Sequence, residues 1–142
     1  MILMRSDDCL ARRVWPAALL LLAATGCGGY YPVHGKVTYE DGTPVAKGIV
    51  VFESKDSARP VVARGDIEPD GTYRLGTQKP GDGAPAGKYR VLVTPRVENP
   101  DAPEVPFDRR FSSFDTSGLE FEVKAGDNDF PIKVSRPGKG RR

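Results

Sequence analysis

Two neighbouring stretches decide the fold: Val33-His34-Gly35-Lys36-Val37-Thr38-Tyr39 and Gly48-Ile49-Val50-Val51-Phe52-Glu53. In the first stretch, apolar or small residues alternate with polar ones, the period of two expected of a half-buried strand. The second stretch is continuously apolar over four residues, which predicts a central strand. Between them, Glu40-Asp41-Gly42-Thr43-Pro44 contains the Asp-Gly pair that supplies the positive φ of a tight turn. The sequence therefore opens its folded part with two strands joined by a turn.

The same pattern continues along the rest of the chain. Five further strands are expected between turn signals, at 61–67, 72–77, 88–94, 118–124 and 129–135. Pro131 cannot donate to a strand ladder, so the last strand is expected at a sheet edge. The segment 95–117 contains four prolines and lacks periodicity, which predicts a long connection without helices. About seven short strands and no helical window predict an all-β fold, an antiparallel seven-stranded β-sandwich.

Composition supports one β domain behind an apolar leader. The chain has 142 residues, enough for a single domain, and its 28% charged fraction excludes a multi-pass membrane protein. The first 26 residues hold 17 of the hydrophobic residues. The remainder has three Leu against thirteen Val and carries 27 of the 29 Gly and Pro residues, which argues against a helix bundle or a doubly wound enzyme domain.

Residues 1–26 have the layout of a secretory signal peptide. Three arginines precede an apolar run at 14–24, which would span only about 16 Å as a helix against a bilayer core of roughly 30 Å. The following Leu22-Ala23-Ala24-Thr25-Gly26-Cys27 resembles the lipobox of bacterial lipoproteins, although Ala24 stands where Leu is usual. The resemblance implies cleavage between Gly26 and Cys27 and acylation of Cys27. The alternatives are an ordinary cleaved signal, an uncleaved anchor and twin-arginine export.

These observations divide the chain into four expected parts. They are a lipoprotein signal peptide at 1–26, a lipidated tether at 27–32, a β-sandwich at 33–135 and a disordered basic tail at 136–142. The expected location is the bacterial cell envelope, with the domain facing the periplasm or the surface. Gly28 follows the cysteine where Asp would imply inner-membrane retention, so the resemblance favours the outer membrane. The membrane, reached through the acyl chains on Cys27, is the first expected partner.

The turn and strand motifs resemble a carboxypeptidase regulatory-like, transthyretin-like domain. The resemblance is carried by the residues at 33–38, 41–52, 70–75 and 86–93, which read VHGKVT, DGTPVAKGIVVF, DGTYRL and AGKYRVLV. The stretches 79–87 and 116–119 further resemble short lipoproteins of planctomycete-type bacteria. The resemblance covers nearly all of the chain after the leader and implies a transthyretin/prealbumin-like sandwich, with an Ig-like Greek key as the alternative. Members often serve as accessory or cell-surface modules, and the motifs are silent on activity.

His34 and the Gly81–Lys88 loop are the candidates for catalysis and for phosphate binding. Hydroxyisourate hydrolase is a transthyretin-like enzyme with a His on its first strand, but it ends in Tyr-Arg-Gly-Ser and this chain does not. We interpret His34 as a solvated strand residue. The loop has Asp82 and Tyr89 where a phosphate-binding loop needs Gly and Ser or Thr, so it predicts no nucleotide site.

No metal or cofactor is expected. Asp127-Asn128-Asp129 offers oxygen ligands, but the spacing of an EF-hand is absent, so we interpret it as a turn that uses Asx side chains. Cys9 would leave with the leader and Cys27 would become a thioether. Residues 28–142 then hold no thiol, which excludes zinc–thiolate, iron–sulfur and thiol-nucleophile chemistry there. The sequence predicts no catalytic residue.

Charge is distributed unevenly along the chain. The leader carries +1, residues 27–135 carry −3 and residues 136–142 carry +4. A mildly acidic domain argues against a nucleic-acid partner. The expected function is a non-enzymatic, membrane-anchored lipoprotein that binds an envelope protein or a glycan, or serves a structural role. The loops 78–87 and 95–117 are the expected contact surfaces. The alternatives are a hydrolase of the hydroxyisourate type and a small-ligand module.

Overall fold

The structure is a computed structural model of the 142-residue chain, and it describes residues 29–55, 58, 60–96, 101 and 105–138. The expected signal peptide, its cleavage site at Gly26 and the acylated Cys27 lie outside these residues. The last four residues of the expected basic tail, 139–142, lie outside them as well. The folded domain and the first residues of the tail can therefore be compared with the sequence-based expectations.

Within the described residues the chain forms ten strand segments, one 3-10 helix and one short α-helix. Seven of the strands have three residues or more. The elements are β1 (Tyr30–Tyr31), β2 (Val33–Tyr39), β3 (Ile49–Ser54), β4 (Val62–Asp66), β5 (Thr72–Arg74), β6 (Ala84–Pro85), β7 (Gly87–Thr94), η1 (Arg109–Ser112), α1 (Phe114–Ser117), β8 (Leu119–Val123), β9 (Asn128–Asp129) and β10 (Ile132–Val134).

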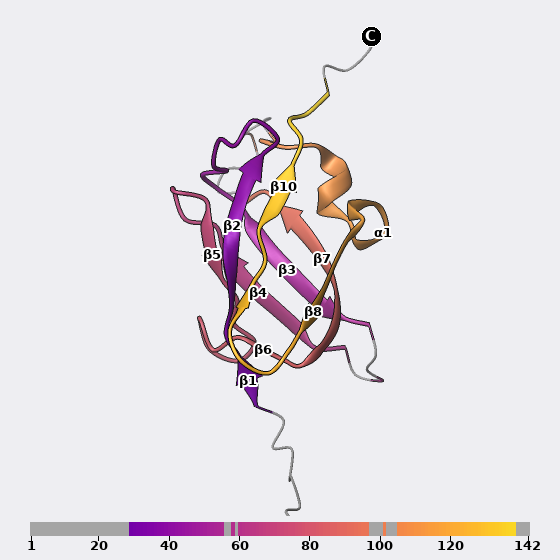
Figure 1. Ribbon diagram of the computed structural model, residues 1–142. Coiled ribbons are helices and arrows are strands. Elements are labelled where there is room, and N and C mark those ends of the chain that lie inside the picture. The colour runs from indigo at the N-terminus through magenta and orange to yellow at the C-terminus, as the bar shows by residue number, and fades with distance from the viewer. Residues whose placement is uncertain (1–28, 56–57, 59, 97–100, 102–104, 139–142) are drawn as a thin grey trace, which may run out of the picture.

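Two four-stranded sheets enclose the core, which confirms the all-β sandwich. One sheet has the order β4-β3-β7-β8, and the other has the order β10-β2-β5 with β9 also paired to β2. Strands β1 and β6 form a small antiparallel ladder at the end of the sandwich where the described chain begins (Figure 1). Every pair is antiparallel except those that join β2 to β9 and to β10, which are parallel. The exception arises because the chain crosses to the other sheet after β8 and does not turn back as a hairpin.

Alternation in the sequence accounts for the core. Strand β2 is buried at Val33, Gly35, Val37 and Tyr39, as its period of two predicts. Strand β3 is central, between β4 and β7, but only Val50 and Phe52 of its apolar run are buried. The ring of Phe52 packs against three other aromatic rings, with centroids 5.9–6.0 Å away. Those rings belong to Tyr89 of β7, Phe121 of β8 and Phe130 between β9 and β10.

The last expected strand is divided in two. Strands β9 and β10 are separated by Phe130 and Pro131, and β10 lies at the edge of its sheet, as the proline predicts. Arg136, the first residue of the expected tail, is ordered against the domain. Its guanidinium lies 3.0 Å from the carboxylate of Asp41 and 4.1 Å from the centre of the Tyr39 ring.

The connection 95–117 differs from its prediction in the part that the structure describes. It holds η1 and α1, and it inserts Phe107 and Phe111 into the core. Each helix has only four residues, so no helical periodicity could reveal it in the sequence. The Asp108 side chain accepts a hydrogen bond from the Arg110 amide at 3.0 Å and so caps η1. Neither of these two described helices is long and apolar enough to cross a membrane.

Substitution of Gly35 tests the close approach between β2 and the segment that carries β9 and β10. A Cβ at this position would lie 2.1 Å from the carbonyl oxygen of Phe130, which is a backbone atom and cannot rotate away. We expect Gly35→Ala to lower the free energy of unfolding by about 1–3 kcal/mol in chemical denaturation. Gly138→Ala is the matched control, because a Cβ there meets no atom within 4 Å. Equal unfolding midpoints for the two variants would contradict this account of the β2 packing.

Candidate functional site

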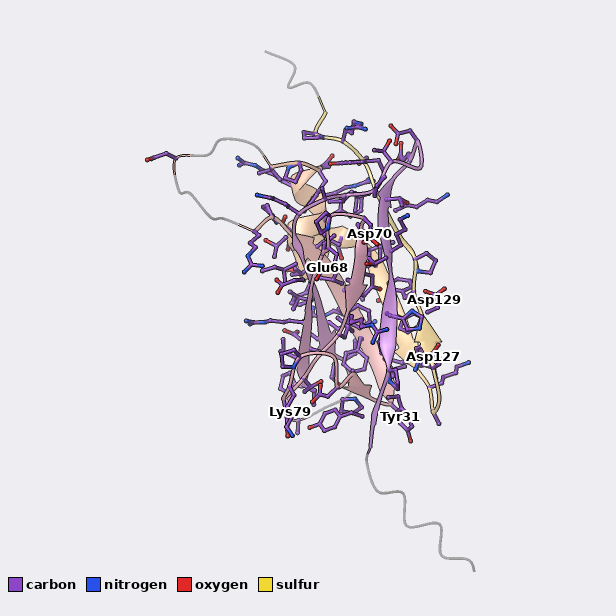
Figure 2. All side chains as sticks on the ribbon, turned by 90° about the vertical axis from the view of Figure 1, so that its left-hand side faces the viewer. Tyr31, Glu68, Asp70, Lys79, Asp127 and Asp129 are labelled. Carbon is purple, nitrogen blue, oxygen red and sulfur yellow. The ribbon has the colours of Figure 1, made fainter. Side chains whose placement is uncertain are left out.

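His34 is held by two carboxylates, that of Asp127 in the turn after β8 and that of Asp129 in β9. Its Nε2 lies 2.9 and 3.0 Å from the two carboxylate oxygens of Asp127, and its Nδ1 lies 3.6 Å from Asp129. Figure 2 labels the two aspartates, which lie close to each other. Because a carboxylate only accepts hydrogen bonds, Nε2 carries the proton in this contact. Within the described part of the chain, no hydroxyl or thiol is hydrogen-bonded to His34. The contacts fasten the turn to β2 and provide no activated nucleophile.

The interpretation of His34 as simply solvated was therefore incomplete. Its side chain is 38% exposed, but it is paired. No sequence pattern signals this pairing, because Asp127 is 93 residues away and the parallel pairing of β9 with β2 was not predicted.

Asn128 confirms the expectation of a turn that uses an Asx side chain. Its side chain accepts a hydrogen bond from the Lys124 amide at 2.9 Å. It donates to the carbonyl oxygens of Lys124 and Gly126 at 2.9 and 3.0 Å. The side chain is thus committed to the backbone of the turn. Among the described residues, no group of three or more His, Cys, Asp or Glu side chains could hold a metal ion.

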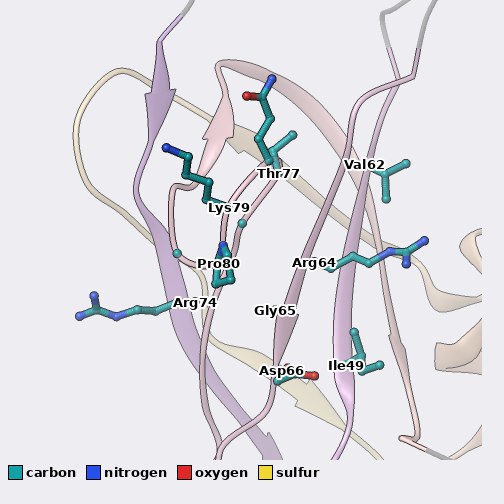
Figure 3. A pocket seen from close by; sticks show the side chains of 12 residues that line it. Ile49, Val62, Arg64, Gly65, Asp66, Arg74, Thr77, Lys79 and Pro80 are labelled. Carbon is teal, nitrogen blue, oxygen red and sulfur yellow. The ribbon is translucent and has the colours of Figure 1, made fainter.

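Two adjoining hollows form a groove that the sequence did not predict. One hollow of about 490 Å³ lies between β4 and the loop 77–81 (Figure 3). A second, of about 790 Å³, adjoins it and is lined by His34 and Thr72 among others. The two share Asp66, Arg74, Pro80 and Gly81. We call this continuous feature the β4–β5 groove.

The strands that line the groove are joined by backbone bridges, and we call this joined backbone its floor. Strands β4 and β5 are the last strands of different sheets, and the chain around them is joined by bridges between Arg64 and Gly76 and between Ile67 and Tyr73. A Cβ on Gly76 would lie 2.2 Å from the carbonyl oxygen of Lys79. The glycine therefore permits the loop 77–81 to fold over the floor and form one wall.

Asp82 fixes that wall. Its carboxylate accepts hydrogen bonds from the amides of Thr77 at 2.6 Å, Lys79 at 3.0 Å and Gln78 at 3.1 Å. The bond from the Thr77 amide is the main reason why the pKa of Asp82 lies below its ordinary value. The Thr77 hydroxyl also donates to the carbonyl oxygen of Gly83 at 2.7 Å. The loop is thus organised by one charged side chain.

The groove is positively charged. Its lining includes the exposed side chains of Arg64, Arg74 and Lys79. Within the described residues, none of the three forms an ion pair with a carboxylate. Two acidic residues also line the groove. Asp66, which both hollows share, lies 3.2 Å from Arg96, and the exposed Glu68 lines only the second hollow, so basic side chains outnumber acidic ones. Such an arrangement can bind an anion such as a phosphate or a carboxylate.

Of the contact surfaces expected from the sequence, the loop 78–87 contributes to this groove through Gln78, Lys79, Pro80 and Gly81. The described part of the segment 95–117 does not line it. The signal that could have revealed the groove is the outward position of Arg64 and Arg74 on their strands. It becomes informative only when the two strands are known to be neighbours.

Comparison with protein-family models and with curated proteins finds no match. Among solved structures, the chain is similar to a DUF3823 family protein from Parabacteroides merdae, with 17% identity and a TM-score of 0.45. That alignment covers 77% of this chain and 47% of the other, so this chain spans about half the length of the DUF3823 chain. It is also similar to the major plantain pollen allergen Pla l 1, with 15% identity, a TM-score of 0.35 and coverage of 78% and 98%.

The role of Asp82 predicts how the groove wall responds to mutation and to acid. Asp82→Ala should accelerate amide hydrogen exchange at 77–79 severalfold, because three N–H groups lose their acceptor. In the wild type, the lowered pKa means that the loop is fully held above the ordinary Asp pKa and loosens as the pH falls through the lowered one. Glu40→Ala is the control, because Glu40 is an exposed acid of the 40–44 turn. Unchanged exchange in Asp82→Ala would contradict this role.

Proposed function

We propose that the protein is a non-enzymatic, membrane-anchored lipoprotein whose β-sandwich is a binding or structural module of the bacterial cell envelope. The proposal joins the leader and the lipobox-like sequence before Cys27 to the sandwich in the structure. The transthyretin-like, carboxypeptidase regulatory-like family assignment belongs to this proposal too. It is supported by the turn and strand motifs of the sequence and by the two-sheet architecture.

The position where the chain enters the domain carries the proposal. Strand β1 begins at Tyr30, three residues after Cys27, so an extended connection between them spans only about 10 Å. Figure 1 shows β1 at one end of the sandwich, while β10 leads the chain out at the opposite end. An acylated Cys27 would therefore hold the β1 end close to the membrane. The opposite end, with the turn 40–44 and the residues after β10, would point away from it.

Binding is favoured over catalysis by the chemistry of the exposed groups. The β4–β5 groove presents three cations, which suit recognition of an acidic group on an envelope lipid, protein or glycan. The alternative of a hydroxyisourate-type hydrolase relied on His34, and both ring nitrogens of His34 face carboxylates, those of Asp127 and Asp129. We therefore propose no enzymatic activity, no resident cofactor and no nucleic-acid partner.

Metabolic labelling with radioactive palmitate tests the anchor. The wild type and Cys9→Ser should both take up label, because Cys9 lies in the leader that is removed. Cys27→Ser should take up none, since its hydroxyl cannot replace the thiol as the acyl acceptor. Label that persists on Cys27→Ser would refute the proposed function, as would an unlabelled wild type that is correctly exported.

A further inference from the structure

We propose that the β4–β5 groove binds the phosphate groups of anionic lipids in the membrane that carries the protein. The groove would thereby fix the orientation of the domain on the bilayer surface. This inference rests on the proposed anchor at Cys27. It goes beyond the anchor by assigning a ligand class to Arg64, Arg74 and Lys79.

Position is the first argument. Figure 2 shows Lys79 at the same end of the molecule as Tyr31, the end at which the described chain begins. Figure 3 shows the groove running from Lys79 and Thr77 along β4 to Asp66. The headgroup layer is about 5–8 Å thick on each side of a bilayer. A connection of about 10 Å from Cys27 to β1 therefore brings the Lys79 end of the groove to the level of the lipid phosphates.

Charge is the second argument. Residues 27–135 carry a net charge of −3, so most of the domain surface is not attracted to an anionic membrane. In the first hollow, by contrast, Arg64, Arg74 and Lys79 are exposed and form no salt bridge among the described residues, and the exposed acid Glu68 lines only the second hollow. The planar guanidinium of arginine can donate two parallel hydrogen bonds to a phosphate. An anionic surface is therefore favoured at this groove over the rest of the domain.

Rigidity is the third argument. The carboxylate of Asp82 holds the backbone of Thr77, Gln78 and Lys79 before any ligand arrives. A site whose backbone is already ordered loses less conformational entropy when it binds. The backbone that carries Lys79 is therefore already held in its position when a ligand binds.

The aromatic residues at the same end are consistent with a membrane contact. Tyr30 is 37% exposed, and it is the large hydrophobic residue that the described surface exposes most clearly. Tyr31 is half-buried beside it. Tyrosine side chains favour the membrane–water interface because the ring is apolar and the hydroxyl is polar. Two glycines separate them from the proposed anchor at Cys27.

The test uses the full-length, processed protein isolated from membranes and reconstituted into two kinds of vesicle. One contains phosphatidylcholine alone, and the other contains phosphatidylcholine with phosphatidylglycerol. A membrane-impermeant acetylating reagent modifies exposed lysines, and mass spectrometry gives the rate at each site. We expect Lys79 to react several times more slowly on the anionic vesicles at low salt, and this protection to disappear at high salt. Lys133, an exposed residue of edge strand β10, should react equally on both vesicles.

Matched variants isolate the groove. Arg64→Gln should remove most of the protection of Lys79, because the loss of one basic residue near an anionic surface weakens binding about fivefold. Arg109→Gln removes one exposed arginine from η1 and should leave the protection unchanged. Equal acetylation of Lys79 on both vesicles would overturn the inference. Any protection that is equal on the two vesicles would be explained by shielding by the bilayer alone.

Two further outcomes separate the groove from the anchor and from other ligands. Flotation with the vesicles reports on the acyl anchor independently. Protein that floats but shows no lipid-dependent protection keeps the proposed function and loses this inference, whereas protein that does not float loses the anchor. If soluble polygalacturonate protects Lys79 and anionic vesicles do not, the inference is overturned and the groove is assigned to an acidic glycan.

Discussion

Strand β2 pairs with β5 on one side and with β9 and β10 on the other. The pairing with β9 and β10 depends on the close approach of the Phe130 backbone to Gly35. Only a residue without a Cβ leaves room for that carbonyl. The approach allows the chain, after it leaves β8, to return parallel to β2 and close the second sheet. The Asn128 side chain holds the turn between β8 and β9. His34 of β2 contacts the carboxylates of Asp127 and Asp129 at the same place. One crowded point on β2 thus connects the start and the end of the domain.

The groove is a consequence of the same arrangement. Because β5 lies on the other side of β2, its outward residues meet those of β4, the edge strand of the opposite sheet. Arg64 and Arg74 come from these two strands, and Lys79 comes from the loop that Asp82 organises. The charge of the groove therefore depends on strand placement and on one carboxylate. Neither arginine is needed for the core, which leaves both available to a ligand.

The sequence predicted the local elements better than their partners. The alternation of Val33 to Tyr39 predicted β2 with its observed bounds, and Pro131 predicted an edge strand. The parallel pairing of β9 and of β10 with β2 was missed. Alternation sets which face of a strand is buried but does not identify the neighbouring strand. The helices η1 and α1 were missed because four residues are too few to show a period. The groove was missed because its cations come from three separate segments.

The central claim is that a short tether from an acylated Cys27 holds this sandwich at a membrane. The most direct measurement is mass spectrometry of the N-terminal peptide of the protein isolated from membranes. The account predicts that this peptide begins at Cys27 and carries the added mass of a diacylglycerol, with or without a further acyl chain. A peptide that begins elsewhere, or an unmodified Cys27 within it, would contradict the account.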